Sequence, residues 1–168
     1  MSERSPAPGG LALVESLVNT LDLESGADTL DTADGRARFG LTADEVPYAR
    51  ELRESLRAAL LAHAGHPPHR SVTPLGRLLS GAPLYVSVDE GDGSATLTPT
   101  EDGPLLFRVA AAVAEALVAG TWQRLKACEA VTCHWAYYDR SPAGRGRWCS
   151  MQVCGARAKM RRYRAKEA

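Results

Sequence analysis

Two short segments decide the fold at the C-terminal end of this chain, CEAVTC at residues 128–133 and CSMQVC at residues 149–154. Each segment begins and ends with a cysteine, and 15 residues lie between Cys133 and Cys149. Two close cysteine pairs joined by an insert of hairpin length suit a tetrahedral zinc site, in which each pair spans one edge of the tetrahedron. We therefore expect one zinc ion bound by all four cysteines of the chain, Cys128, Cys133, Cys149 and Cys154.

The region around these cysteines is too small to fold by apolar burial alone. Residues 122–165 contain few large aliphatic side chains. A bound metal would supply the missing stability, because the free energy of metal binding becomes free energy of folding. Since four thiolates leave no open coordination position, we expect a structural zinc and not a catalytic one. The alternatives are free cysteines, disulfide bonds, or His134 as a substitute ligand.

The charge of the 168-residue chain is distributed unevenly, although the formal net charge is zero. Residues 1–120 carry 9 Lys/Arg and 17 Asp/Glu, whereas residues 121–168 carry 11 Lys/Arg and 3 Asp/Glu. The resulting net charges of −8 and +8 predict an acidic body and a basic module with a polyanionic partner. Four thiolates around one dication would lower the charge of the module to about +6.

The basic residues gather in the turn before Cys149 and in the segment after Cys154. We expect them to bind DNA, first through phosphates and then by bidentate contacts from arginine to guanine. The candidate nucleic-acid-binding residues are Arg145, Arg147, Arg157, Lys159, Arg161, Arg162 and Arg164. The alternative is a protein-interaction module, whose basic finger docks on an acidic protein surface of its own chain or of a partner.

Apolar spacing predicts a mostly helical N-terminal part. We expect helices at residues 11–21, 43–63, 71–81 and 104–126. Thr42 followed by Glu45 predicts a capping box at the start of the second helix. Two alternating runs, at residues 84–88 and 95–98, flank a turn with Asp-Gly and predict an antiparallel hairpin.

The cysteine-rich part is expected to contain a second hairpin and a helix. Residues 135–139 and 146–149 would be its strands, and Ser150 would cap a helix that runs to about Arg164. The predicted fold class is α+β, with a disordered lead at residues 1–10. A mostly helical domain with one hairpin at residues 11–120 would precede a treble-clef-like zinc finger at residues 122–165.

The same segments resemble a known bacterial family, the CGNR zinc fingers. The resemblance covers most of residues 122–164 and rests on five segments, RLKAC at 124–128, CHW at 133–135, DRS at 139–141, RWCSM at 147–151 and CGARAK at 154–159. The LVNTL segment at residues 17–21, together with the hairpin and the helix after it, resembles the ABATE domain that precedes this finger. The resemblance implies a stress-induced transcription regulator. Two positions depart from the pattern, Ala156 in place of asparagine and Ser16 in place of an acidic residue.

Other functional classes find little support in the sequence. No apolar run reaches the roughly 20 residues of a membrane-spanning helix, and residues 1–10 lack the features of a signal peptide. We therefore expect a cytoplasmic protein without a membrane partner. No catalytic motif is recognisable, so we do not expect an enzyme. The resemblance allows a small-molecule ligand in the N-terminal domain, and a homodimer would suit a regulator although no dimerisation motif is present.

Overall fold

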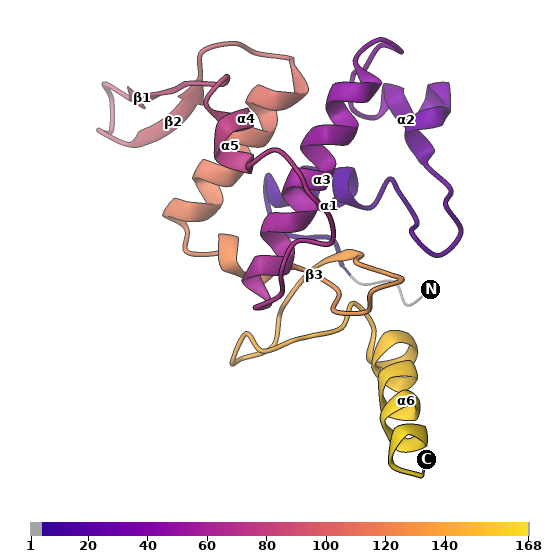
Figure 1. Cartoon of the computed structure of the whole chain (residues 1–168). Coiled ribbons are helices and arrows are strands. Elements are labelled where there is room, and N and C mark those ends of the chain that lie inside the picture. The colour runs from indigo at the N-terminus through magenta and orange to yellow at the C-terminus, as the bar shows by residue number, and fades with distance from the viewer. Residues whose placement is uncertain (1–4, 168) are drawn as a thin grey trace.

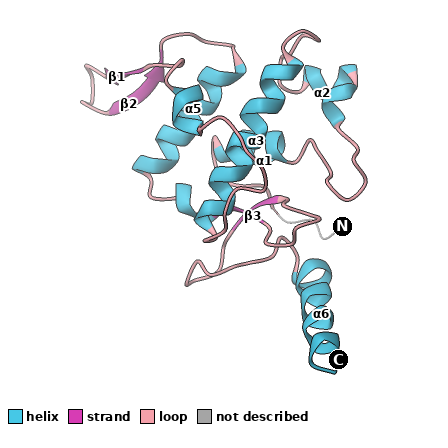
Figure 2. Ribbon diagram, viewed as in Figure 1, coloured by secondary structure: helices cyan, strands magenta, loops and turns pink. Residues whose placement is uncertain are grey.

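The computed structural model describes residues 5–167 of the chain. Three helices form the body, α1 (Leu11–Val18), α3 (Val46–His63) and α5 (Leu105–Val118), and a basic helix, α6 (Ala156–Glu167), extends away from it (Figure 1). The strands form two separate antiparallel hairpins (Figure 2). The predicted α+β class is therefore confirmed. Within the described residues, no helix is both long and apolar enough to cross a membrane.

Helix α1 is shorter than predicted. Its apolar stripe, Leu11, Val14, Leu17 and Val18, is fully buried, as the spacing requires. The helix ends at Val18 instead of residue 21, because Asn19 is the C-cap and Leu21 forms an isolated β-bridge with Asp28. Two short helices follow, η1 (Thr29–Asp31) and α2 (Ala33–Ala37), and the Thr32 hydroxyl caps the second by accepting a hydrogen bond from the Gly35 amide at 3.0 Å.

Helix α3 begins three residues later than predicted. One half of the expected capping box is present, since the Thr42 amide donates to Oε2 of Glu45 at 2.8 Å. However, the N-cap of the helix is Glu45, with Pro47 in the first turn, where a missing amide hydrogen costs nothing. Its buried apolar side chains pack against α1, and its C-terminal half packs against strand β3.

The first hairpin is confirmed. Strand β1 (Leu84–Val88) pairs with β2 (Ala95–Pro99), in a register that sets Val86 opposite Leu97. The helix predicted at residues 71–81 is reduced to α4 (Leu75–Leu79). The hairpin lies against α5 through β2.

The predicted continuation of α5 to residue 126 is wrong. The helix ends at Val118, and Gly120 adopts a φ of 66°, a left-handed conformation that favours glycine and terminates helices. A short helix η2 (Trp122–Arg124) leads into strand β3 (Leu125–Ala127), which pairs with β4 (Ala136–Tyr138). The second hairpin is therefore built from these strands, and residues 146–149 form no strand.

This second hairpin packs into the core of the body. Leu125, Ala127 and Ala136 are buried in the same apolar cluster as the inner faces of α1, α3 and α5. The chain then passes through one turn of π-helix, η3 (Met151–Gly155), into α6. Ser150 caps η3, since its hydroxyl accepts from the Val153 amide at 3.3 Å, and the predicted cap at this position is confirmed. The two cysteine segments are thus held between a buried hairpin and a projecting helix.

Candidate metal centre and basic helix

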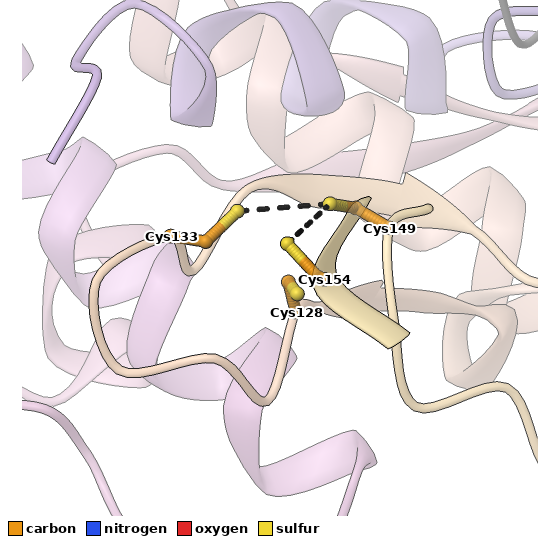
Figure 3. A group of neighbouring side chains, drawn as sticks. All are labelled: Cys128, Cys133, Cys149 and Cys154. Atoms are coloured by element: carbon orange, nitrogen blue, oxygen red, sulfur yellow. Dashed lines mark hydrogen bonds between the residues drawn. The ribbon is translucent and has the colours of Figure 1, made fainter. Parts of the chain in front are cut away.

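The four cysteines converge on one point (Figure 3). Cys128 and Cys133 lie in the loop that joins β3 to β4, and Cys149 and Cys154 lie on either side of the start of η3. All four sulfur atoms are within 4.8 Å of one another. The Cys133 and Cys149 sulfurs are 3.6 Å apart, and those of Cys149 and Cys154 are 3.8 Å apart. The two pairs predicted from the sequence therefore form one cluster.

These distances fit a tetrahedral metal ion. Zinc–sulfur bonds of about 2.3 Å place neighbouring sulfurs about 3.8 Å apart at the corners of a tetrahedron. The four cysteines are free of disulfide bonds, in which the sulfurs would be about 2.05 Å apart. The cluster is therefore positioned to bind a metal ion, and a set of four thiols is typical of structural zinc.

The pKa shifts of the four thiols favour a cation at the centre of the cluster. Hydrogen bonds from the Cys133 and Cys149 thiols lower the pKa of Cys128, whereas the reciprocal bonds to Cys128 raise the pKa of Cys133 and of Cys149. Burial raises the pKa of Cys154. One thiolate thus suppresses ionisation of its neighbours, and a dication at the centre would remove this repulsion.

Backbone hydrogen bonds shape the first cysteine loop. The Cys128 amide donates to the Trp135 carbonyl at 2.9 Å, and the Cys133 amide donates to the Ala130 carbonyl at 2.8 Å. His134 is buried with a φ of 45°, and its Nδ1 lies 2.9 Å from the Cys128 carbonyl oxygen. This contact occupies one ring nitrogen of His134, which therefore supports the loop instead of replacing a cysteine.

A buried ion pair holds the second half of the finger. Nζ of Lys126 lies 2.9 Å from Oδ2 of Asp139, and both side chains are buried. Asp139 also accepts hydrogen bonds from the amides of Ser141, at 3.0 Å, and Gly146, at 2.7 Å. Burial raises the pKa of Asp139, but these hydrogen bonds outweigh it and the pKa lies below its ordinary value. This anchored turn directs residues 147–149 back toward the first cysteine pair.

Gly155 is tightly packed beside the metal centre. A β-carbon at this position would lie 3.1 Å from the Met151 sulfur and 3.2 Å from Cδ1 of Trp148. A side chain at this position, at the end of η3, would require Met151 or Trp148 to shift by a few tenths of an ångström. The packing therefore limits the direction in which α6 leaves the finger.

The predicted nucleic-acid-binding residues fall into two groups. Arg145 lies on the exposed turn, and Arg147 forms a bidentate ion pair with Glu129 and stacks over the Trp148 ring at 5.3 Å. The other five are exposed on α6, namely Arg157, Lys159, Arg161, Arg162 and Arg164. Arg157 donates to the Glu24 carboxylate at 3.0 Å. In the described part of the chain, no other basic side chain of α6 forms an ion pair, so this helix is a largely unpaired positive surface.

Sequence reasoning missed a groove beside this helix. A groove of about 700 Å³ lies between α6 and the loop that carries Trp148, with Arg147, Lys159 and Arg162 along it. Sequence reasoning also missed Glu24, whose carboxylate forms an ion pair with Arg157. No local signal marks either feature, because each depends on residues distant in sequence.

The N-terminal part offers less to a ligand. A cavity of about 200 Å³ lies between residues 8–11 and α5, with Glu115 and Thr121 in its wall. The buried charges of α3 are paired internally, since Arg53 lies 2.8 Å from the Asp28 carboxylate and Arg57 lies 2.5 Å from that of Glu54. This pairing is typical of a structural network. The ligand-sensing expectation stays a prediction.

Two family models match the chain. One, ABATE, described as "Putative stress-induced transcription regulator", matches residues 11–120, more than half of the sequence. The chain belongs to the ABATE family. The second model, described as a CGNR zinc finger, matches residues 124–167 and contains all four clustered cysteines. Both resemblances drawn from the sequence are thereby confirmed. No curated protein matches the chain.

The CGNR zinc-finger match is the one that covers the four-cysteine cluster. In this ABATE protein the cluster lies in the region that the zinc-finger model matches, which supports a zinc-binding site. The two matched regions meet in one apolar core, through β3 and β4. The orientation of the finger relative to the ABATE region is therefore set by packing.

Proposed function

We propose that this ABATE protein is a DNA-binding transcription regulator whose finger holds one structural zinc ion. The observation that carries the proposal is α6, which extends from the body with six basic residues between Ala156 and Lys166 and no acidic one. Over residues 156–166 the side chains of the helix are exposed, apart from half-buried Ala158. Such a surface supports binding to a polyanion.

Cys128, Cys133, Cys149 and Cys154 would hold the ion. Zinc bound there would offset half of the negative charge of four thiolates and join the β3–β4 loop to the start of η3. The chain itself would orient α6. The ion pair of Lys126 with Asp139 holds the turn before Cys149, and the close packing at Gly155 limits the direction in which α6 leaves the finger. The proposed role is the binding of DNA, without a catalytic step. Such a role suits a cytoplasmic protein.

Binding of the zinc-loaded chain to a mixed-sequence DNA duplex, measured by fluorescence anisotropy over a series of salt concentrations, tests the proposal. The logarithm of affinity should fall linearly with the logarithm of salt concentration, with a slope of about −0.9 for each phosphate contacted. Lys159→Ala with Arg164→Ala should weaken binding and reduce the slope by about 2.

The matched control removes two exposed arginines from the body, Arg38 and Arg77. Their replacement by alanine should leave the affinity and the slope unchanged. Absence of binding at low salt would reject the DNA role and favour the alternative, in which the basic finger docks on an acidic protein surface. The ion pair between Arg157 and Glu24 is the one observation that favours this alternative.

A further inference from the structure

Over residues 156–166, helix α6 carries a narrow apolar strip on an otherwise basic surface. Met160 and Tyr163 are 52% and 59% exposed. At 3.6 residues per turn these two positions lie about 60° apart around the helix axis, so their side chains share one face. Among the described elements, only η3 is in extensive contact with α6.

Basic residues border this strip on both sides. The helical period places Arg157 and Arg164 about 80° from its centre on one side, and Lys159 and Lys166 about 80° from it on the other. Half-buried Ala158 lies on the opposite face, among the residues of the groove beside Trp148. The strip therefore points away from the finger that supports the helix.

This arrangement fits the major groove of duplex DNA. The groove is about 12 Å wide, which admits one α-helix of 10–12 Å diameter. A helix lying in it turns one face to the base edges and its two flanks to the phosphates of the two strands. Single-stranded nucleic acid carries only one line of phosphates and would therefore match only one of the two basic flanks.

The apolar strip also indicates which base edge it meets. In the major groove, the 5-methyl group of thymine is the apolar feature of the base pairs. We propose that Met160 and Tyr163 are the base-contacting residues of α6 and that they cover thymine methyl groups in the major groove. This inference rests on the proposed DNA-binding function and adds its recognition surface.

The experiment starts from a duplex enriched from a random-sequence pool by the zinc-loaded wild-type chain. Its affinity is compared with that of the same duplex in which uracil replaces every thymine, so that only methyl groups are removed. The wild type should bind the uracil duplex about fourfold more weakly for each methyl group that it covers. Met160→Ala with Tyr163→Ala should bind the thymine duplex more weakly and lose this discrimination.

A matched control separates this effect from a general loss of exposed apolar surface. Val86 and Val88 are 64% and 59% exposed on β1, in the body. Val86→Ala with Val88→Ala should retain the full discrimination. Zinc content and helical circular dichroism of each variant report on folding.

The two proposals fail in different ways. A wild type that binds both duplexes equally, with a normal salt slope, overturns the thymine inference and leaves the DNA-binding function intact. The same holds if the double variant at positions 160 and 163 keeps the wild-type affinity and discrimination. A wild type that binds no duplex even at low salt overturns both.

Discussion

Asn19 and Ala136 exchange two hydrogen bonds although they are 117 positions apart in the sequence. Nδ2 of Asn19 donates to the Ala136 carbonyl at 3.0 Å, and the Ala136 amide donates to Oδ1 of Asn19 at 2.7 Å. Asn19 is the C-cap of α1, and Ala136 is the first residue of β4. The side chain thus satisfies both backbone groups of Ala136, as a neighbouring strand would, and links the ABATE region to the finger.

Asn19→Ala should destabilise the whole chain. The substitution leaves a donor and an acceptor of Ala136 without their partners in a part-buried position, and we expect a loss of about 1–3 kcal/mol in the free energy of unfolding. Urea unfolding followed by circular dichroism measures the change. Gln123→Ala, which removes an exposed amide, is the control and should have little effect. Equal unfolding midpoints for the two variants would show that the link contributes nothing.

Loss of the metal should unfold only part of the finger. Cys149→Ser should reduce the zinc content from about one equivalent per chain, because structural sites need all four ligands. Amides of η3 and α6 should then exchange rapidly with solvent. Those of Leu125–Ala127 should stay protected, because this strand lies in the main core. Hydrogen exchange with mass spectrometry measures both regions.

Chelation of the wild-type protein provides the comparison for this variant, since it removes the ion without changing the sequence. The two exchange patterns should agree. Full zinc content in Cys149→Ser would refute the assignment of this ligand.

The features that the sequence could predict are those with local signals. The cysteine spacing indicated the cluster, and alternation around an Asp-Gly turn indicated the hairpin of β1 and β2. Strand β3 was missed because its three residues are too few to show a period of two, and Leu125 also fits the apolar spacing of α5. Gly120 was the available signal that the helix ends earlier.

Contacts between distant segments had no such signal. The Thr42–Glu45 hydrogen bond forms as the pattern predicts, yet α3 begins beyond it. The pairing of Asn19 with Ala136 depends on tertiary packing, which neither segment reveals by itself. The same lack of a local signal explains why the sequence analysis paired residues 135–139 with residues 146–149. In the structure, the partner of β4 is β3.

His63 should make the stability of the chain sensitive to mild acid. Its Nδ1 lies 2.7 Å from the Leu125 carbonyl oxygen, and its ring meets that of Trp122 edge-on at 4.9 Å. Burial lowers the pKa of His63. The hydrogen bond to Leu125 opposes this effect and nearby Lys126 adds to it, so the net pKa lies below the ordinary value of 6.5. As pH falls below 6.5, the unfolded chain therefore takes up the proton first, and the free energy of unfolding decreases.

Thermal unfolding at saturating zinc, from pH 7.5 to pH 5.5, tests this expectation. His63→Gln keeps a donor for the Leu125 carbonyl but does not titrate, so its melting temperature should fall less steeply with pH than that of the wild type. Identical slopes for the two proteins would assign the acid sensitivity to other groups.

Glu24→Gln should strengthen the proposed binding of DNA. The Glu24 carboxylate holds Arg157, and the two side chains are 60% and 51% exposed. An exposed ion pair of this kind contributes about 0.2–1 kcal/mol, so freeing the guanidinium should tighten binding by at most about fivefold. The gain should shrink as salt is raised, because screening weakens the ion pair and the phosphate contact alike.

Anisotropy with the mixed-sequence duplex measures this gain, and Glu90→Gln provides the matched control. Glu90 is exposed in the turn between β1 and β2, in the body, so its replacement makes the same change in net charge away from α6. If Glu24→Gln and Glu90→Gln increase the affinity equally, the effect is one of overall charge. If only Glu24→Gln increases it, the acidic loop of the ABATE region competes with DNA for the first turn of the basic helix.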